Sequence, residues 1–330
     1  MKTATASQIL DFIKKNQQAS PRQVTEFFEI SSQSVHRHLK KLMEDNKIVR
    51  IGSAPHVYYK ISENKKYKIE LELTKQEDIF FEKNYLYITP QGNLLYGIEG
   101  FKSWVETNKQ VHLIRKLTDE YLQIRQQYDQ HFDTKIKMIE ASKKFQDTFS
   151  HCQLDHVYYS DFYSLPKFGK TKLGNLVLYA KQAQNVKLIN EVADQVSESI
   201  LRLVKSHKIE SIAWAPHSLP RKVPFLNQIK KNLKLGLPEI IFLKAYSGKV
   251  PIAQKSLSKL EERIDNAENT IYPKENKSAF KNVLIFDDAV GSGATLQAMA
   301  GKLKKMNPKI KTIGYAIVGS LKGFEVIKEV

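Results

Sequence analysis

Apolar residues recur at helical spacing in three segments near the start of the chain, and two short strand-like runs follow them. Ile9, Leu10 and Ile13 share one face of the first predicted helix, which covers residues 6–16. The two later runs are rich in β-branched and aromatic residues, which favours strands. They are KIVRIG and HVYYKI, separated by a turn at Ser53–Pro55. The pattern predicts three helices followed by a two-stranded ribbon.

The second helix has a well-defined N-terminal pattern. Ser20 is a suitable N-cap, Pro21 stands at the first helical position, and Gln23 completes a capping box with Ser20. The residues expected to form its buried stripe are Val24, Phe27 and Phe28. This helix is therefore expected to pack on a core from its first turn.

The third predicted helix, over 32–45, differs between its two faces. Its apolar face comprises Val35, Leu39, Leu42 and Met43. At about 100° per residue, the opposite face carries polar and basic side chains. These are Gln33, Arg37, Lys40 and Lys41. A helix of this kind packs on a core and presents a basic surface to solvent or to a partner.

Three short helices and a ribbon are the plan of a winged helix-turn-helix, which predicts a DNA-binding domain over residues 1–65. The segments QILDFIKKN, SVHRHLKKL and IVRIG resemble those of a DeoR-type N-terminal domain. The third helix would then lie in a major groove. The residues expected to contact DNA are Gln33 and Arg37 at base edges and Lys40, Lys41 and Arg50 at phosphates. The alternatives are a solvated basic helix and a winged helix used for protein contacts.

Residues 66–150 predict a small α+β segment that acts as a linker or in dimerisation. Strand-like runs are followed by a turn, TPQGN, and a long helix from about Asn108. The runs are YKIELEL, DIFFEK and YLYIT. The apolar positions of the long helix span barely two heptads, too few for a coiled coil. Core packing and pairing of two subunits both stay open, and a homodimer is expected because winged helices usually bind two half-sites.

From residue 151 to 330, strand-like runs alternate with helices, including one predicted over 184–206. Four of the runs are short and almost entirely apolar, as strands buried on both faces are. They are IESIAWAP, PEIIFLKAY, NVLIFDDAV and KTIGYAIVGS. This predicts a doubly wound α/β domain with a mostly parallel sheet, which binds ligands beyond the carboxyl ends of its strands.

One of these runs continues into NVLIFDDAVGSGATLQAMA, residues 282–300. Its two glycines let backbone N–H groups turn toward an anion, and the helix that follows also favours negative charge at its N-terminus. Asp287 and Asp288 cannot favour a phosphate, but they suit the vicinal hydroxyls of a ribose. The residues expected to hold the 5-phosphate are Gly291, Ser292, Gly293, Ala294 and Thr295. The stretch therefore predicts a ribose 5-phosphate site. It lacks the lysine of a Walker A loop and the third glycine of a dinucleotide fingerprint.

The same stretch resembles the motif with which type I phosphoribosyltransferases bind 5-phosphoribosyl 1-pyrophosphate (PRPP). Within that superfamily, two further segments resemble ComF-type domains: APHSLPRKVPFLNQ at 215–228 and AQKSLSKLEERIDNA at 253–267. The first implies a pyrophosphate loop made of Ala215, Pro216, His217 and Ser218, with Arg221 nearby. The second implies a flexible loop that carries Gln254, Lys255, Ser258 and Arg263. Mg²⁺ is implied as a cofactor that arrives with PRPP, with no direct protein ligand.

The composition of the chain indicates the kind of partner and the cellular compartment to expect. Lysine and arginine number 52 against 35 aspartate and glutamate residues, a net charge of +17 that favours a polyanionic partner such as nucleic acid. The single cysteine excludes an intrachain disulfide and a cysteine-built zinc site, which fits a reducing cytoplasm. No apolar stretch approaches the roughly 18 residues that a membrane span needs. A cytoplasmic protein without a membrane partner is expected.

These features support three functional hypotheses. The first is a transcriptional regulator whose DNA affinity responds to PRPP or a nucleotide, an architecture that resembles a purine-operon repressor family. The second is an active phosphoribosyltransferase that the winged helix tethers to DNA or to a partner. The third is a DNA-uptake or processing factor of the ComF kind. All three need the same phosphate-binding loop.

Overall fold

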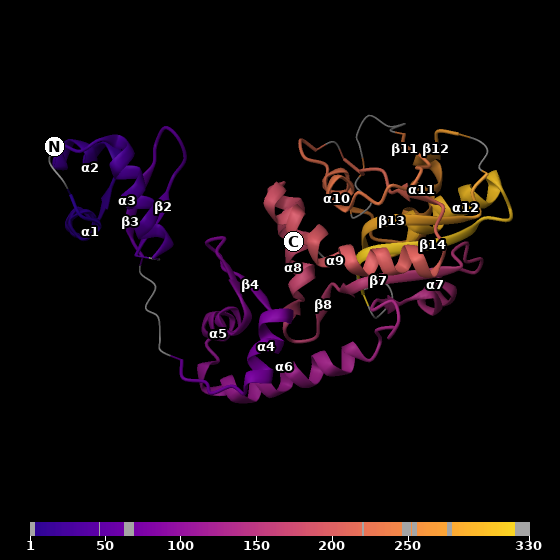
Figure 1. Ribbon diagram of the computed structural model, residues 1–330, viewed down its shortest axis with the longest axis horizontal. Helices are drawn as coiled ribbons and strands as arrows, with labels where there is room; N and C mark the ends of the chain where they lie inside the picture. The colour runs from indigo at the N-terminus through magenta and orange to yellow at the C-terminus, as the bar shows by residue number, and fades with distance from the viewer. Residues whose placement is uncertain are drawn as a thin grey trace. The chain divides into compact units, whose positions relative to one another are not determined.

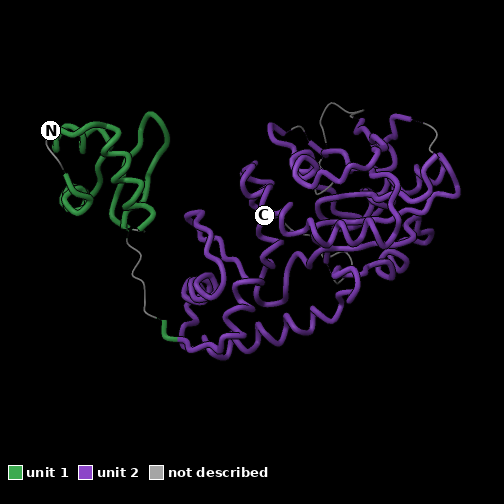
Figure 2. The backbone as a smooth tube through the Cα atoms, viewed as in Figure 1, with its two compact units in different colours: residues 1–70 green, residues 71–330 purple. Residues whose placement is uncertain are grey.

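The computed structural model describes residues 4–45, 47–62, 69–219, 221–245, 252, 256–275 and 279–320. The chain divides into two compact units, residues 1–70 and 71–330 (Figure 2). The second unit contains most of the segment expected to act as a linker or in dimerisation, together with residues 151–330.

The first unit is a winged helix-turn-helix. Its elements are α1 (Ala6–Lys15), β1 (Gln18–Ala19), α2 (Pro21–Phe28), α3 (Ser32–Glu44), β2 (Ile48–Ile51) and β3 (Tyr58–Ile61). The strands form an antiparallel sheet in the order β1-β3-β2. The helices enclose a core that includes Ile9, Ile13, Val24, Val35, Leu39 and Leu42. The predicted order of helices and ribbon is confirmed.

The predicted capping box of α2 is present. The Gln23 amide donates to Ser20 Oγ at 3.2 Å, and the Ser20 amide donates to Gln23 Oε1 at 2.8 Å. The expectation that Phe27 is buried is wrong, because 64% of this residue is exposed. It lies in the last turn of a short helix, where its ring stacks on Phe12 with centroids 4.4 Å apart.

The second unit begins with short elements. They are α4 (Lys75–Asn84), β4 (Leu86–Ile88), β5 (Leu94–Tyr96), α5 (Gly97–Thr107), the 3₁₀ helix η1 (Val111–Leu113), α6 (Ile114–Asp129), β6 (Ile139–Glu140) and α7 (Ser142–Thr148). The strand expected at DIFFEK is wrong: these residues lie in α4, which a capping box between Thr74 and Glu77 starts. The apolar stripe of α6 packs within the chain, since Tyr121 is buried and stacks on Phe81.

The rest of the unit is built around a five-stranded sheet (Figure 1). In chain order the elements are β7 (His156–Phe162), β8 (Ser164–Leu165), β9 (Gly169–Lys170), α8 (Lys172–Ala183), α9 (Val186–Ser206), β10 (Ser211–Trp214), α10 (Phe225–Leu233), β11 (Phe242–Lys244), α11 (Leu260–Thr270), β12 (Ile271–Pro273), β13 (Asn282–Val290), α12 (Ala294–Met306) and β14 (Lys311–Gly319). The strand order is β10-β13-β14-β7-β6. The first four strands are parallel, and β6 is an antiparallel edge.

Helices cover both faces of this sheet, as the apolar runs predicted. Residues 283–286 of β13 and 312–319 of β14 are buried without alternation, which requires cover on each side. Helix α12 packs on β13 and β14, while α8 packs on β14 and β7. The expected mixed α/β fold with a mostly parallel sheet is confirmed.

The run PEIIFLKAY is only partly the parallel strand that its apolar pattern suggested. Glu239 forms a single parallel bridge with Ile212 of β10. Strand β11 then pairs antiparallel with β12 in a separate two-stranded ribbon. The chain leaves the sheet here because β11 finds its hydrogen-bond partners in the segment that follows α11.

The capping box of α2 generates a stability prediction. In Ser20→Ala the helix loses the oxygen that accepts from the Gln23 amide, so α2 is destabilised by about 1 kcal/mol. Amide hydrogen exchange within α2 should accelerate about fivefold in the full-length protein. Ser20→Asp, which keeps an acceptor at the N-cap, should exchange at nearly the parent rate. Equal exchange in the parent and the alanine variant would show that the cap contributes nothing.

Candidate functional site

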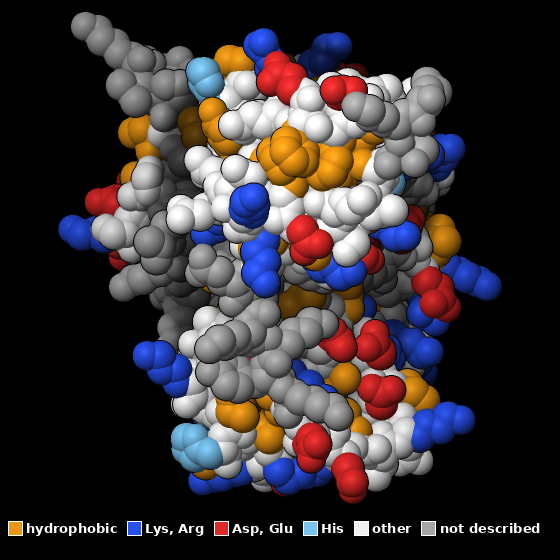
Figure 3. All heavy atoms as spheres, turned by 90° about the vertical axis from the view of Figure 1, so that its left-hand side faces the viewer, with side chains coloured by type: hydrophobic (Ala, Val, Ile, Leu, Met, Phe, Trp, Pro, Cys, Tyr) orange, Lys and Arg blue, Asp and Glu red, His pale blue; other side chains and the backbone are white. Residues whose placement is uncertain are grey.

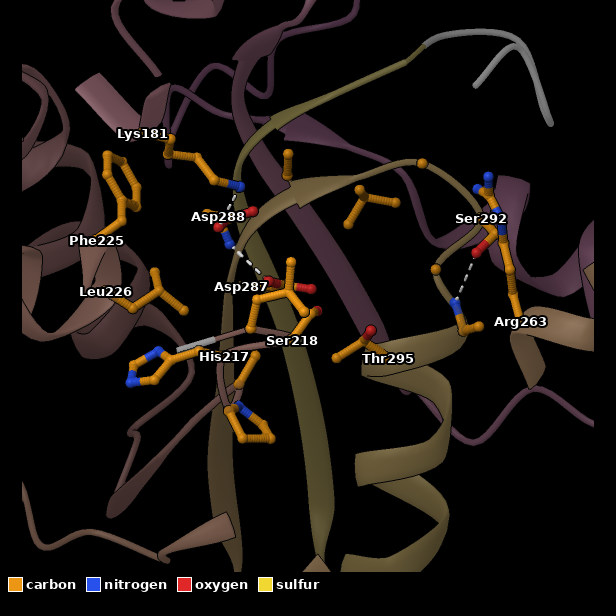
Figure 4. Close-up of a pocket in the computed structure, with 18 of the residues that line it drawn as sticks. Lys181, His217, Ser218, Phe225, Leu226, Arg263, Asp287, Asp288, Ser292 and Thr295 are labelled. Atoms are coloured by element: carbon orange, nitrogen blue, oxygen red, sulfur yellow. Dashed lines mark hydrogen bonds and ion pairs between the residues drawn. The ribbon is translucent and has the colours of Figure 1, made fainter. Parts of the chain in front are cut away.

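A pocket opens beyond the carboxyl ends of β10 and β13, the edge at which open α/β sheets bind ligands (Figure 4). The pocket brings together three segments that were predicted to form a site: residues 215–221, the segment around Arg263, and residues 287–295. The predicted site residues that line it are Ala215, Pro216, His217, Ser218, Arg221, Arg263, Asp287, Asp288, Gly291, Ser292, Gly293, Ala294 and Thr295. Ser258 is exposed and does not line this pocket. Gln254 and Lys255 lie outside the described residues.

The wall formed by residues 291–295 is suited to an anion. Gly293, the N-cap residue of α12, has φ +78°, a conformation that favours glycine, and it has no side chain with which to cap the first turn. The only side-chain hydrogen bond here among the described groups is a long one, from the Ala294 amide to Ser292 Oγ at 3.4 Å. The first N–H groups of a helix lack intrahelical partners, and they favour negative charge.

A phenylalanine from far earlier in the chain supports this wall. A Cβ atom at position 293 would lie 2.5 Å from Cε1 of Phe145, which is buried on α7. Position 293 therefore needs glycine for two reasons, its backbone conformation and the close approach of this ring. Local sequence patterns do not indicate this contact, because Phe145 and Gly293 are 148 positions apart.

Asp287 and Asp288 lie within β13, which runs from Asn282 to Val290. Asp287 stands opposite Ala316 of β14, and the Asp288 amide donates to Asp287 Oδ1 at 2.8 Å. The ladder pairs Asp287, skips Asp288 and resumes at Ala289 opposite Val318, while the side chains of both aspartates line the pocket. Two fixed carboxylates beside an anion-binding loop can accept hydrogen bonds from a diol.

Lys181 is a pocket residue that the sequence reasoning missed. Its Nζ lies 2.6 Å from Asp288 Oδ2, and the two side chains are only 14% and 20% exposed. Figure 4 shows the lysine reaching Asp288 from the opposite wall. Burial lowers the pKa of His217, while nearby Asp288 acts in the opposite direction. No helix was predicted over residues 172–183, and no local pattern indicates which strand the last turn of α8 faces.

The loop after β10 is tied to the end of α8. Arg221 Nη1 donates to the Lys181 carbonyl oxygen at 2.6 Å, and the Val223 amide donates to Gln184 Oε1 at 2.9 Å. The backbone of α8 and this loop therefore form one wall of the pocket.

Arg263 lies on α11 beside the loop formed by residues 291–295, rather than on an open flexible segment. It is 4% exposed, and its Nε donates to the Leu257 carbonyl oxygen at 2.8 Å. A Cβ atom at position 291 would lie 3.6 Å from its Nη1. Burial lowers the pKa of the guanidinium. The guanidinium thus adds positive charge to the wall formed by residues 291–295.

The predicted DNA-contacting side chains all lie at the surface of the first unit. They are Gln33, Arg37, Lys40, Lys41 and Arg50. Lys40 is 3.8 Å from Glu44 in an exposed pair that contributes little to stability. On the face drawn in Figure 3, basic side chains alternate with acidic ones, so the excess of positive charge does not form a single-sign patch there.

Comparison with known families assigns both domains. Residues 3–56 match the model of the MarR family, and residues 221–320 match that of the phosphoribosyl transferase domain. The chain carries a MarR-family winged helix-turn-helix domain and a phosphoribosyltransferase domain. No curated protein matches it at a significant level.

Two solved structures are similar to part of the chain. One is a hypoxanthine phosphoribosyltransferase from Staphylococcus aureus, with 13% identity and a TM-score of 0.24 over 41% of this chain and 65% of that one. The other is an adenine phosphoribosyltransferase from Leishmania tarentolae, with 13% identity and a TM-score of 0.21 over 42% and 74%. Because both scores are low, the fold assignment rests on the domain matches and on the sheet.

The part of the chain that the structure describes contains no group of three or more His, Cys, Asp or Glu side chains that could hold a metal ion. The carboxylates in the pocket are nevertheless oxygen donors of the kind that Mg²⁺ accepts, and they fit a cation that a phosphorylated ligand brings with it. None of the described helices is long and apolar enough to cross a membrane.

The contact between Gly293 and Phe145 generates a prediction with an internal control. Gly293→Ala should lower the free energy of unfolding by about 2–4 kcal/mol, because it combines backbone strain with a steric clash. Gly301→Ala, in the interior of the same helix, meets only Gln153 Cγ at 3.5 Å and should be neutral or stabilising by up to about 1 kcal/mol. Urea denaturation of both variants checks this. Equal stability of the two would contradict the assigned role of Phe145.

Proposed function

We propose that the protein is a DNA-binding transcriptional regulator whose phosphoribosyltransferase domain binds PRPP or a ribonucleotide as its effector. It acts in the cytoplasm as a homodimer on two half-sites. The winged helix reads DNA, and the second domain supplies the ligand-dependent signal.

One observation carries the proposal: the acid pair, the uncapped helix N-terminus and the loop after β10 line a single pocket. Asp287 and Asp288 would accept hydrogen bonds from the ribose hydroxyls. Residues 291–295 would hold the 5-phosphate, with the Arg263 guanidinium beside them. Residues 215–218 and Arg221 would face the pyrophosphate. Mg²⁺ bound to PRPP would neutralise part of the pyrophosphate charge.

Regulation requires that the ligand distinguish two states of the protein. An effector shifts DNA binding only by as much as its affinity differs between the DNA-competent and DNA-incompetent forms. In the DNA-bound form, Arg37 and Gln33 would contact base edges, while Lys40, Lys41 and Arg50 would contact phosphates. The net charge of +17 supports a polyanionic partner.

An active phosphoribosyltransferase is the second candidate, and the buried Arg263 beside the phosphate-binding loop favours it. In that reaction a nucleophile forms a bond to ribose C1 as the bond from C1 to the pyrophosphate oxygen breaks. The protein would contribute chiefly by stabilising charge on the leaving group. The segment from Leu257 to Asn266 supports a ComF-type domain, and the DeoR-type character of the winged helix stays a prediction.

Two parallel measurements distinguish these functions. The regulator hypothesis predicts that Mg-PRPP or a nucleotide changes the affinity for promoter DNA by fivefold or more, on the order of 1 kcal/mol of coupling. It also predicts that Asp287→Asn/Asp288→Asn abolishes the change and that no base supports release of pyrophosphate. Turnover combined with a DNA affinity that is indifferent to every ligand would instead establish the enzyme.

The basic face of α3 is tested separately. Arg37→Ala should weaken binding to promoter DNA by about 1–3 kcal/mol and reduce discrimination against unrelated DNA, because a base contact is lost. Lys187→Ala removes an exposed charge from α9 in the other unit and serves as the control. The assignment fails if both variants bind DNA as the parent does, or if both weaken it equally.

A further inference from the structure

The charges in the pocket follow an order that the proposed function does not explain. Arg263 lies beside Gly291 at one end, and Lys181 contacts Asp288 at the other, with the acid pair between them (Figure 4). A ligand that complements this order carries an anion, then hydroxyl donors, then a second anion. Ribose 5-phosphate with a neutral substituent at C1 provides only the first two.

We infer that Lys181 makes the pocket selective for a ribose 5-phosphate that bears an anionic group at C1, and hence for PRPP over a nucleoside monophosphate. This inference rests on the proposed function. Of the two effector classes in the proposed function, PRPP and a ribonucleotide, it selects PRPP. It also assigns a specificity-determining role to a residue outside the three motifs found in the sequence.

The pairing of Lys181 with Asp288 gives the first reason. Both side chains are largely removed from water, so a buried ammonium that loses its partner is costly unless another anion replaces it. Ribose hydroxyls that donate to Asp288 compete with Lys181 for the same carboxylate oxygens. A pyrophosphate at C1 provides a new anionic partner for the Lys181 ammonium, whereas a neutral base leaves that ammonium beside an apolar surface.

The position of Lys181 gives the second reason. The carbonyl of the same residue accepts from Arg221, and Gln184 accepts from the Val223 amide, so this turn of α8 is fixed against the loop after β10. An anion bound by that loop is therefore close to the lysine. The ring of Phe225, with its centroid 6.0 Å from Nζ, packs beside the ammonium and limits where it can move.

Affinities of the full-length protein for three ligands test the inference: Mg-PRPP, ribose 5-phosphate and a purine nucleoside monophosphate. The parent protein should bind Mg-PRPP most tightly. Lys181→Met should weaken Mg-PRPP by about 10- to 100-fold, the worth of a charge-assisted hydrogen bond, but ribose 5-phosphate by less than about threefold. Lys181→Arg, which keeps the positive charge, should retain much of the parent's preference for Mg-PRPP over ribose 5-phosphate. Lys187→Met is the control for removal of a lysine charge.

Isothermal titration calorimetry gives these affinities, and circular dichroism establishes that each variant is folded. If the methionine variant does not fold, Lys181→Gln keeps a donor for Asp288 and replaces it in the comparison. An equal loss for PRPP and ribose 5-phosphate, or no loss at all, overturns the inference. Tighter binding of the nucleotide than of PRPP by the parent also overturns it, while the proposed effector role stands. Only a parent protein that binds none of the three ligands contradicts the proposed function itself.

Discussion

Strand β13 is an inner strand of the parallel sheet, hydrogen bonded to β10 on one side and to β14 on the other. Because parallel strands end at the same edge, the segments that follow β10 and β13 meet there although some 70 positions of chain separate them. The acid pair, the loop formed by residues 291–295 and the loop after β10 depend on this pairing for their proximity. Residues from other parts of the chain also pack against the loop at 291–295: Phe145 contacts Gly293, and Arg263 lies beside Gly291.

Charge balance is the second constraint on the pocket. Two adjacent carboxylates that are partly removed from water repel one another, and a nearby cation offsets that repulsion. Lys181 supplies that cation to Asp288 from helix α8. We propose that the same ion pair makes the pocket selective, because a ligand that binds the Asp288 carboxylate must also supply an anion for Lys181. On this proposal, one contact contributes both to the stability of the folded pocket and to its selectivity for the ligand.

Local patterns predicted much of this protein, and long-range contacts account for what they did not. The capping box at Ser20 and the Gly-rich turn after β13 were readable because each depends on residues a few positions apart. Short apolar runs were less reliable: the residues around Phe81 form a helix, and β11 joins a ribbon instead of the parallel sheet. Lys181 and Phe145 had no readable pattern, since their partners lie more than 100 positions away and the fold alone brings them together.

The central claim is that the edge formed by β10 and β13 binds a phosphoribosyl ligand. A crystal structure of the protein with Mg²⁺ and PRPP tests it most directly. The account predicts the 5-phosphate on the backbone amides of residues 291–295, with the ribose hydroxyls on Asp287 and Asp288. An empty loop in crystals where the ligand is bound elsewhere, or a ligand whose phosphate lies away from the N-terminus of α12, would contradict it.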